Sequence, residues 1–251
     1  MLNTSPTWTP AAEDYNRLFL EQNPWHSLGE VPTALALEIE RSIVEHLEQR
    51  LQIQEPRRFQ IILGPRRVGK TTSLYQVIKG LLASGIDAKR LWWMRLDHPL
   101  LMQISLGDLV RHIVEISKAT PENPAFIFLD ELAYADKWDV WLKTFYDEQW
   151  PVRIVGSSSA TAVLRQRHLE SGVGRWEEHY LAPYLFNEFL RLEKKNFSVY
   201  GGNSLWETIE NAITEKPDVS SLAVERRRYL FTGGFPELLK TRSQLPSATL
   251  R

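Results

Sequence analysis

The residues from Gly64 to Thr71 have the types and the spacing of a loop that binds phosphate groups. They fit the pattern G-x-x-x-x-G-K-[ST] and follow an apolar run at 59–63. Glycines allow the backbone of such a loop to turn tightly and to bring its N–H groups near phosphate oxygens. Lys70 supplies a positive charge between the β- and γ-phosphates, and Thr71 offers a hydroxyl to Mg²⁺. The pattern predicts a nucleoside triphosphate site formed by Gly64, Pro65, Arg66, Arg67, Val68, Gly69, Lys70, Thr71 and Thr72.

Two adjacent acids supply the second half of this site. Asp130 and Glu131 directly follow the apolar run 125–129, which is typical of a strand covered on both faces of a parallel sheet. This position puts both carboxylates at the carboxyl edge of the sheet, where ligands of open α/β folds bind. We expect Asp130 to hold Mg²⁺ and Glu131 to polarise a water molecule for attack on the γ-phosphate. The alternative is an acidic helix start in solvent, and the nearby loop argues against it.

A run of serines and one arginine are further candidates. Ser157, Ser158 and Ser159 end the next strand, where a hydroxyl can sense the γ-phosphate or orient the water, and we assign this role to Ser158. The choice among the three serines stays open, with Ser157 and Ser158 favoured over Ser159, and serines also simply form turns. Arg175 follows a glycine-rich stretch and suits a mobile cation aimed at a phosphate. Its spacing fits a surface arginine equally well.

Strands and helices alternate along the first two thirds of the chain, which predicts a doubly wound α/β sheet. Residues 1–32 contain four prolines and are expected to form an irregular lead-in. We expect a core that binds the nucleoside triphosphate at 33–195 and a small all-helical lid at 196–251. Strands are predicted at 59–63, 91–96, 125–129, 151–156 and 178–181. One helix is predicted to start at the end of the phosphate loop and to run to residue 82, and others at 34–52, 105–117, 138–145, 184–194, 205–213, 222–231 and 237–242.

Composition narrows the class of protein. The 251 residues include 30 basic and 31 acidic side chains, so that a net charge of −1 provides no overall field toward nucleic acid or an anionic membrane. The absence of cysteine excludes disulfides and thiolate metal sites. No apolar stretch approaches the length of a membrane span. We expect a cytoplasmic protein without membrane contact, and the histidines show no spacing for a metal other than Mg²⁺.

Several motifs together resemble the prokaryotic AAA-type P-loop ATPases whose Walker A motif reads G-P-R-R-V-G-K-T-T. The resemblance implies an ASCE-type sheet of order 5-1-4-3-2, ATP as the nucleotide, Asp130 and Glu131 as Walker B, and the serine segment as first sensor. It rests on residues 64–72, 129–131, 156–159, 170–175 and 233–237, with Asn23-Pro24-Trp25 and Leu96-Asp97-His98-Pro99 as further marks.

The resemblance also suggests roles for one residue in each of the last two motifs, 170–175 and 233–237. It implies that Arg175 meets a γ-phosphate and that Pro236 places the helical lid against adenine, although 233–236 also fits a plain helix-to-helix turn. Such proteins usually continue into a C-terminal domain, so that we expect a truncated or minimal form.

The expected function is slow Mg²⁺-dependent ATP hydrolysis that drives a conformational or assembly switch in a homo-oligomer or with a protein partner. One alternative is an ATP-regulated nucleic-acid-binding module in defence or mobile-element control, which the net charge does not support. The other is a nucleotide-binding switch with little turnover.

Overall fold

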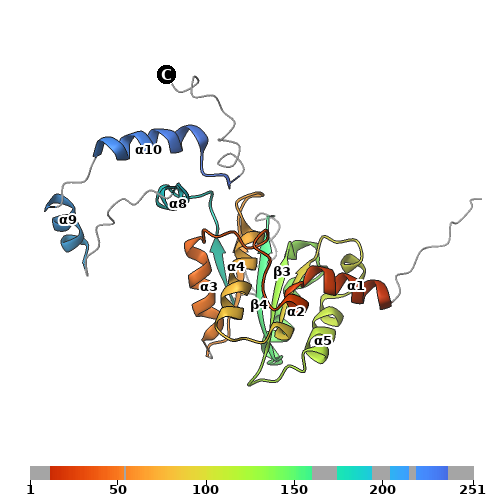
Figure 1. Ribbon diagram of the computed structural model, residues 1–251. Helices are drawn as coiled ribbons and strands as arrows, with labels where there is room; N and C mark the ends of the chain where they lie inside the picture. Colours follow the sequence, from red (N-terminus) through yellow and green to blue (C-terminus); the bar gives the residue numbers. More distant parts are fainter. Residues whose placement is uncertain (1–11, 54, 160–173, 194–203, 215–218, 237–251) are drawn as a thin grey trace, which may run out of the picture. The chain divides into compact units, whose positions relative to one another are not determined.

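The computed structural model describes residues 12–53, 55–159, 174–193, 204–214 and 219–236 (Figure 1). The chain divides into two compact units, Met1–Leu181 and Ala182–Arg251. The motif residues 170–173 and the predicted helix at 237–242 lie outside the described ranges. The functional division that the sequence places between 195 and 196 stays a prediction.

A five-stranded parallel sheet forms the centre of the first unit. Its strand order is β2-β3-β4-β1-β5, which is the predicted order 5-1-4-3-2 counted from the other edge. Because all neighbouring pairs are parallel, the carboxyl ends of all five strands lie at one edge of the sheet. The strands are β1 (Phe59–Leu63), β2 (Leu91–Arg95), β3 (Ala125–Asp130), β4 (Val152–Ser158) and β5 (Trp176–Tyr180). The predicted fold class is confirmed.

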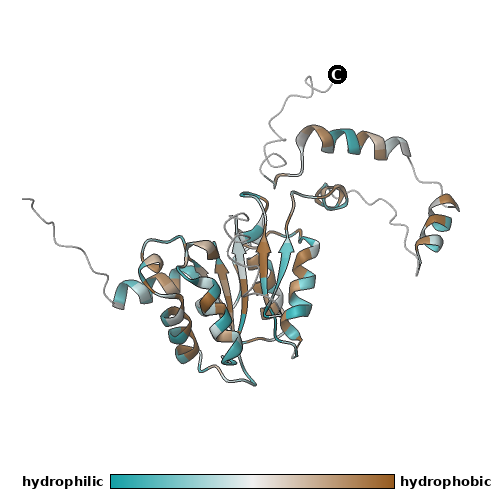
Figure 2. Ribbon diagram, turned by 180° about the vertical axis from the view of Figure 1, so that it is seen from behind, coloured by the Kyte–Doolittle hydropathy of each residue, from teal (hydrophilic) through white to brown (hydrophobic). Residues whose placement is uncertain are grey.

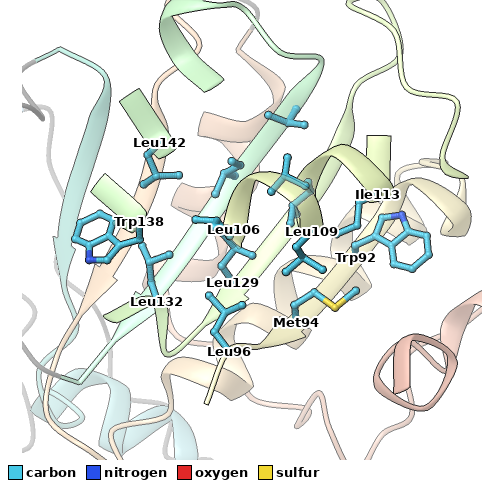
Figure 3. Packing of buried hydrophobic residues seen from close by; sticks show 14 of the residues in the cluster. Trp92, Met94, Leu96, Leu106, Leu109, Ile113, Leu129, Leu132, Trp138 and Leu142 are labelled. Atoms are coloured by element: carbon cyan, nitrogen blue, oxygen red, sulfur yellow. The ribbon is translucent and has the colours of Figure 1, made fainter. Parts of the chain in front are cut away.

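Helices cover both faces of the sheet. The helices α5 (Leu106–Ile116) and α6 (Trp138–Asp147) pack on one face through buried side chains such as Leu109 and Leu142 (Figure 3). The helices α3 (Ser42–Gln52) and α4 (Lys70–Ala83) pack together, and Tyr75 of α4 meets Trp93 of β2 on the other face. The inner strands are accordingly apolar, whereas the edge strand β5 is mostly hydrophilic (Figure 2). This pattern is the one expected for a doubly covered parallel sheet.

The prediction of an irregular lead-in was wrong for residues 12–28. The helix α1 (Ala12–Gln22) fits between Pro10 and Pro24, because the thirteen residues between these two helix breakers contain no proline. The short helix α2 (Trp25–Leu28) begins directly after Pro24, a position where proline is tolerated.

Side chains of α1, α2 and their junction cover the outer edge of β2. The Asn23 Oδ1 atom accepts from the Trp93 N–H at 2.6 Å, and the Gln22 Oε1 atom accepts from the Arg95 N–H at 3.0 Å. The Trp25 Nε1 atom donates to the Leu91 carbonyl at 2.9 Å. These side chains satisfy backbone groups that an edge strand would otherwise leave without a strand partner.

The helix predicted at 34–52 begins eight residues later, at Ser42. The Gln76 Nε2 atom donates to the carbonyls of Leu37 (2.7 Å) and Ile39 (3.0 Å), so that this stretch finds its partners on α4 rather than within a helix of its own. The fifth strand begins at Trp176, two residues before its predicted start.

The second unit is helical where it is described, as its sequence predicts. It contains α8 (Phe186–Leu192), α9 (Leu205–Thr214) and α10 (Val219–Thr232). The Tyr229 ring of α10 lies 5.4 Å from the Phe189 ring, and its hydroxyl donates to the Tyr184 carbonyl at 2.8 Å. No helix within the described ranges combines the length and the apolar character that a bilayer crossing requires. Among the described residues of the first unit there are also three short helical turns, η1 (Ala88–Arg90), η2 (Leu101–Gln103) and η3 (Leu132–Tyr134).

Candidate functional site

The loop between β1 and α4 has two glycines, and each is required for a different reason. Gly69 has a φ of +96°, and a Cβ added there would point into open space, so that the left-handed backbone rather than crowding selects glycine. A Cβ on Gly64 would lie 2.3 Å from the Leu181 carbonyl oxygen, which leaves no room for a side chain. Together they let the loop turn from the carboxyl end of β1 directly into the first turn of α4, whose free N–H groups suit an anion.

Lys70 is buried at the start of α4, and its ammonium group turns back onto the loop. Its Nζ atom donates to the carbonyls of Gly64 (3.0 Å) and Pro65 (2.9 Å). Burial lowers the pKa of Lys70, while the carboxylates of Glu131 and Asp130 act in the opposite direction. The loop therefore holds a desolvated cation within reach of any anion that it encloses.

Asp130 ends β3 beside the loop, and only 3% of its surface is exposed. The Thr71 hydroxyl donates to Asp130 Oδ2 at 2.7 Å, and the Ser157 hydroxyl donates to Asp130 Oδ1. Burial raises the pKa of Asp130, and these two hydrogen bonds offset only part of that effect. A desolvated carboxylate next to a hydroxyl is a set of oxygen donors that fits Mg²⁺, because a hard divalent cation prefers such ligands and compensates the buried charge.

Glu131 lies at the exit of the strand, with a φ of +57° that turns the chain sharply after Asp130. The Ser159 hydroxyl donates to Glu131 Oε2 at 2.9 Å, and the Glu131 N–H donates to the Ser157 hydroxyl at 3.3 Å. The end of β4 therefore fixes both the backbone and the carboxylate of Glu131. Glu131 is less buried than Asp130.

Two serines of the predicted sensor segment contact the acid pair: the Ser157 hydroxyl donates to Asp130, and the Ser159 hydroxyl donates to Glu131. Ser157 and Ser158 are the last two residues of β4, and successive side chains of a strand point to opposite faces, so that these two serines face different sides of the sheet. The choice of Ser158 among the three serines stays a prediction. The sensing role itself stays a prediction.

Arg175 does not lie at this edge of the sheet. It directly precedes β5, and the Phe59 N–H at the start of β1 donates to its carbonyl at 3.0 Å. Its guanidinium pairs with Asp147, with Nε to Oδ1 at 2.8 Å and Nη2 to Oδ2 at 3.0 Å. A strand of five residues spans about 17 Å, which separates Arg175 from the phosphate loop of its own chain.

Two other residues of the sequence analysis lie apart from the acid pair. Pro236 belongs to the second unit, so that its contact with adenine stays a prediction. Asp97 lies in the turn after β2 and pairs with Arg95, with 2.9 Å from Nε to Oδ1, which fits the turn role. In the part of the chain that the structure describes, three or more histidine or acidic side chains nowhere gather as a metal cluster.

The sequence analysis missed one residue that contacts the loop. Arg41 is buried, and its Nη1 atom donates to the Val68 carbonyl at 3.0 Å. It lies 27 residues before Val68, outside any local motif, so that spacing alone provided no signal for it.

Comparison with known proteins was consistent with this geometry. A family model described as an AAA domain matches residues 56–190. Two uncharacterized proteins of Methanocaldococcus jannaschii are each 28% identical: MJ1544 over 183 residues (73% of this chain, 36% of that protein) and MJ1637 over 186 residues (72% and 38%). The chain thus spans little more than a third of the length of these relatives.

Among solved structures, PCH-2 of C. elegans matches with a TM-score of 0.43 and 14% identity, over 66% of this chain and 50% of that one. The Aeropyrum pernix ORC1 protein in complex with DNA matches with a TM-score of 0.44 and 14% identity, over 69% and 52%. These two similarities are too low to carry an argument about function. The family match, in contrast, covers more than half of the sequence. On that match, the chain belongs to the AAA domain family.

Proposed function

We propose that this chain binds ATP with Mg²⁺ and hydrolyses it slowly, and that the cycle drives a conformational or assembly switch. The observation that carries the proposal is the buried Asp130 carboxylate, which receives hydrogen bonds from Thr71 of the loop and from Ser157 of the neighbouring strand. Membership of the AAA domain family supports nucleotide binding and hydrolysis. The choice of ATP rests on the family resemblance.

Each residue of the site has a separate task in this proposal. The loop amides and the first turn of α4 bind the phosphates, and the Lys70 ammonium turns from the carbonyls of its own loop to the phosphate oxygens. Thr71 and Asp130 hold Mg²⁺, which when bound neutralises charge on the β- and γ-phosphates.

Glu131 accepts a proton from the attacking water molecule. Ser159 orients its carboxylate through the hydrogen bond of 2.9 Å, and a group so positioned contributes about 10²–10⁴-fold to a rate. Pro236 packs on the adenine in the same proposal, and the switch acts between copies of this chain or on a protein partner.

Two substitutions separate binding from chemistry. Lys70→Ala is expected to abolish tight ATP binding, since it removes the cation that meets the triphosphate. Glu131→Gln is expected to keep ATP bound and to lower hydrolysis by about 10²–10⁴-fold, because an amide has the same shape but cannot act as a base. Calorimetric titration with Mg²⁺ and ATP, combined with phosphate release, measures both effects.

The contradictory result is equally specific. A Glu131→Gln variant that loses affinity for ATP but turns over each bound ATP at the normal rate would exclude Glu131 as the base. Wild-type protein that binds ATP no better than Lys70→Ala would exclude the proposed function as a whole.

A further inference from the structure

The phosphate loop is held from its buried side by a residue that does not belong to it. Arg41 is only 5% exposed, although arginine is rarely buried, and its Nη1 atom donates to the Val68 carbonyl at 3.0 Å. Val68 itself is fully buried and immediately precedes Gly69 and Lys70. The contact is therefore made within the loop, two residues before Lys70, which meets the phosphates in the proposed function.

This hydrogen bond fixes the direction of one peptide plane. The Val68 carbonyl and the Gly69 N–H belong to the same planar trans peptide, in which the two groups point in opposite directions. A carbonyl held toward Arg41 therefore directs the Gly69 N–H to the opposite side of the loop. Gly69 has a φ of +96°, which a glycine adopts without strain, and no atom lies near the position of an added Cβ. Since glycine is flexible, this conformation needs a contact from outside the residue to hold it in place.

The segment that carries Arg41 is also bound to the helix that follows the loop. Gln76 is 1% exposed, and its Nε2 atom donates to the carbonyls of Leu37 and Ile39. Residues 37–41 are thus attached to α4 through the carbonyls of Leu37 and Ile39, and to the loop through the side chain of Arg41. Movement of the loop therefore has to move this segment and the start of α3, which begins at Ser42.

We propose that Arg41 is a positioning residue of the nucleotide site: it orients the Val68–Gly69 peptide for phosphate binding and links the loop to residues 37–41. The inference rests on the proposed function, because it concerns how the same site binds nucleotide. Arg41 donates to a carbonyl of the loop, so that its removal acts on nucleotide binding through the loop backbone. Its effect falls on ATP and ADP alike, since both carry the β-phosphate that the loop encloses.

The test compares Arg41→Ala with a matched arginine elsewhere. Arg90 also donates to a backbone carbonyl, that of Pro124, from Nε at 3.0 Å and from Nη2 at 2.8 Å. It lies directly before β2, at the amino ends of the strands, whereas the loop lies at their carboxyl ends. Arg41→Ala is expected to raise the Kd of both ATP and ADP about tenfold or more, while kcat at saturating ATP falls less than threefold. Arg90→Ala is expected to lower Tm and to leave both Kd values unchanged. Arg41→Lys, which can still donate to the Val68 carbonyl, is expected to restore part of the affinity.

Calorimetry with ATP and with ADP, steady-state kinetics and thermal unfolding are measured on all four proteins. A wild-type Kd in folded Arg41→Ala would overturn the inference, as would an equal loss of affinity in Arg90→Ala. If Arg41→Ala does not fold, Gln76→Met decides: a raised Kd for both nucleotides supports the inference, and an unchanged Kd overturns it. A wild-type chain that binds no better than Lys70→Ala would instead overturn the proposed function and this inference with it.

Discussion

Asp130 is the residue at which binding and stability conflict most directly. Its carboxylate is almost fully buried, and burial raises its pKa although two hydroxyl groups donate to it. A raised pKa means that the folded chain tolerates the charged form less well than the unfolded chain does, so that ionisation of Asp130 at neutral pH lowers the free energy of unfolding. Such a cost is expected where a site is built to receive a cation.

Asp130→Asn is therefore expected to stabilise the nucleotide-free protein. The amide removes the buried charge and keeps the shape, and a gain of about 1 kcal/mol corresponds to a rise in Tm of about 3 °C. The further rise in Tm that Mg²⁺ and ATP produce in the wild type should be lost in this variant. Thermal unfolding with and without the nucleotide measures both, and Glu131→Gln, at a less buried acid, is the control with little change in Tm. A lower Tm for nucleotide-free Asp130→Asn would contradict this argument.

The sequence predicted which residues form the centre of the site, but not which neighbours hold them. Lys70, Thr71 and Asp130 follow from motif spacing and from the rule that parallel strands end at one edge. The choice among the three serines depends on which face of β4 turns toward β3, and a register shift of one residue reverses that face. Arg41 depends on a contact across 27 residues, which no local pattern encodes.

At the scale of elements, the segment 22–26 acts as a cap on the open edge of the sheet. Asn23 is fully buried, and its side chain both accepts from the Trp93 N–H and donates to the Phe19 carbonyl at 2.8 Å. Trp25, also fully buried, continues the contact toward α4, since its ring lies 6.1 Å from that of Tyr75. The Asn-Pro-Trp motif thus has a structural role at β2, which its sequence alone did not indicate.

Asn23→Ala is expected to lower the free energy of unfolding by about 3 kcal/mol. The substitution leaves the Trp93 N–H and the Phe19 carbonyl without their hydrogen-bond partner, and each unsatisfied buried group costs about 1–3 kcal/mol. Gln22→Ala is the matched control, because the Gln22 bond to the Arg95 N–H lies at the exposed end of the same edge, where water replaces it at little cost. Urea denaturation of both variants measures the difference, and equal losses would show that Asn23 has no special role.

The alternation of strands and helices predicted the order of elements, because doubly covered strands are apolar along their whole length. Boundaries were less predictable where side chains replace backbone partners. The helix expected from residue 34 begins at Ser42, since Gln76 binds the carbonyls of Leu37 and Ile39. The helix α1 was not predicted, because the four prolines of residues 1–32 indicate an irregular segment, whereas the stretch between Pro10 and Pro24 is free of proline and long enough for a helix.

At the scale of the whole molecule, the position of Arg175 decides how it can act. The amino edge of the sheet carries Arg175 and its partner Asp147, and the carboxyl edge carries the loop and the acid pair. An arginine on the far edge cannot meet the nucleotide of its own chain without a large rearrangement of β5. Any contact with a γ-phosphate must therefore be made with the nucleotide of another subunit, which is the arrangement that the expected homo-oligomer would provide.

If Arg175 acts on a neighbouring subunit, two inactive variants should restore activity when they are mixed. An interface between Lys70→Ala and Arg175→Ala subunits pairs an intact loop with an intact arginine, and such an arginine is worth about 10³–10⁵ in rate. The control mixes Arg175→Ala with the double variant Lys70→Ala/Arg175→Ala, in which no interface contains both groups. Light scattering with ATP, with ADP and without nucleotide establishes that the subunits assemble. Recovery of phosphate release in the first mixture and not in the second is the expected result, whereas co-assembled subunits without recovery would show that Arg175 does not act on a neighbouring subunit.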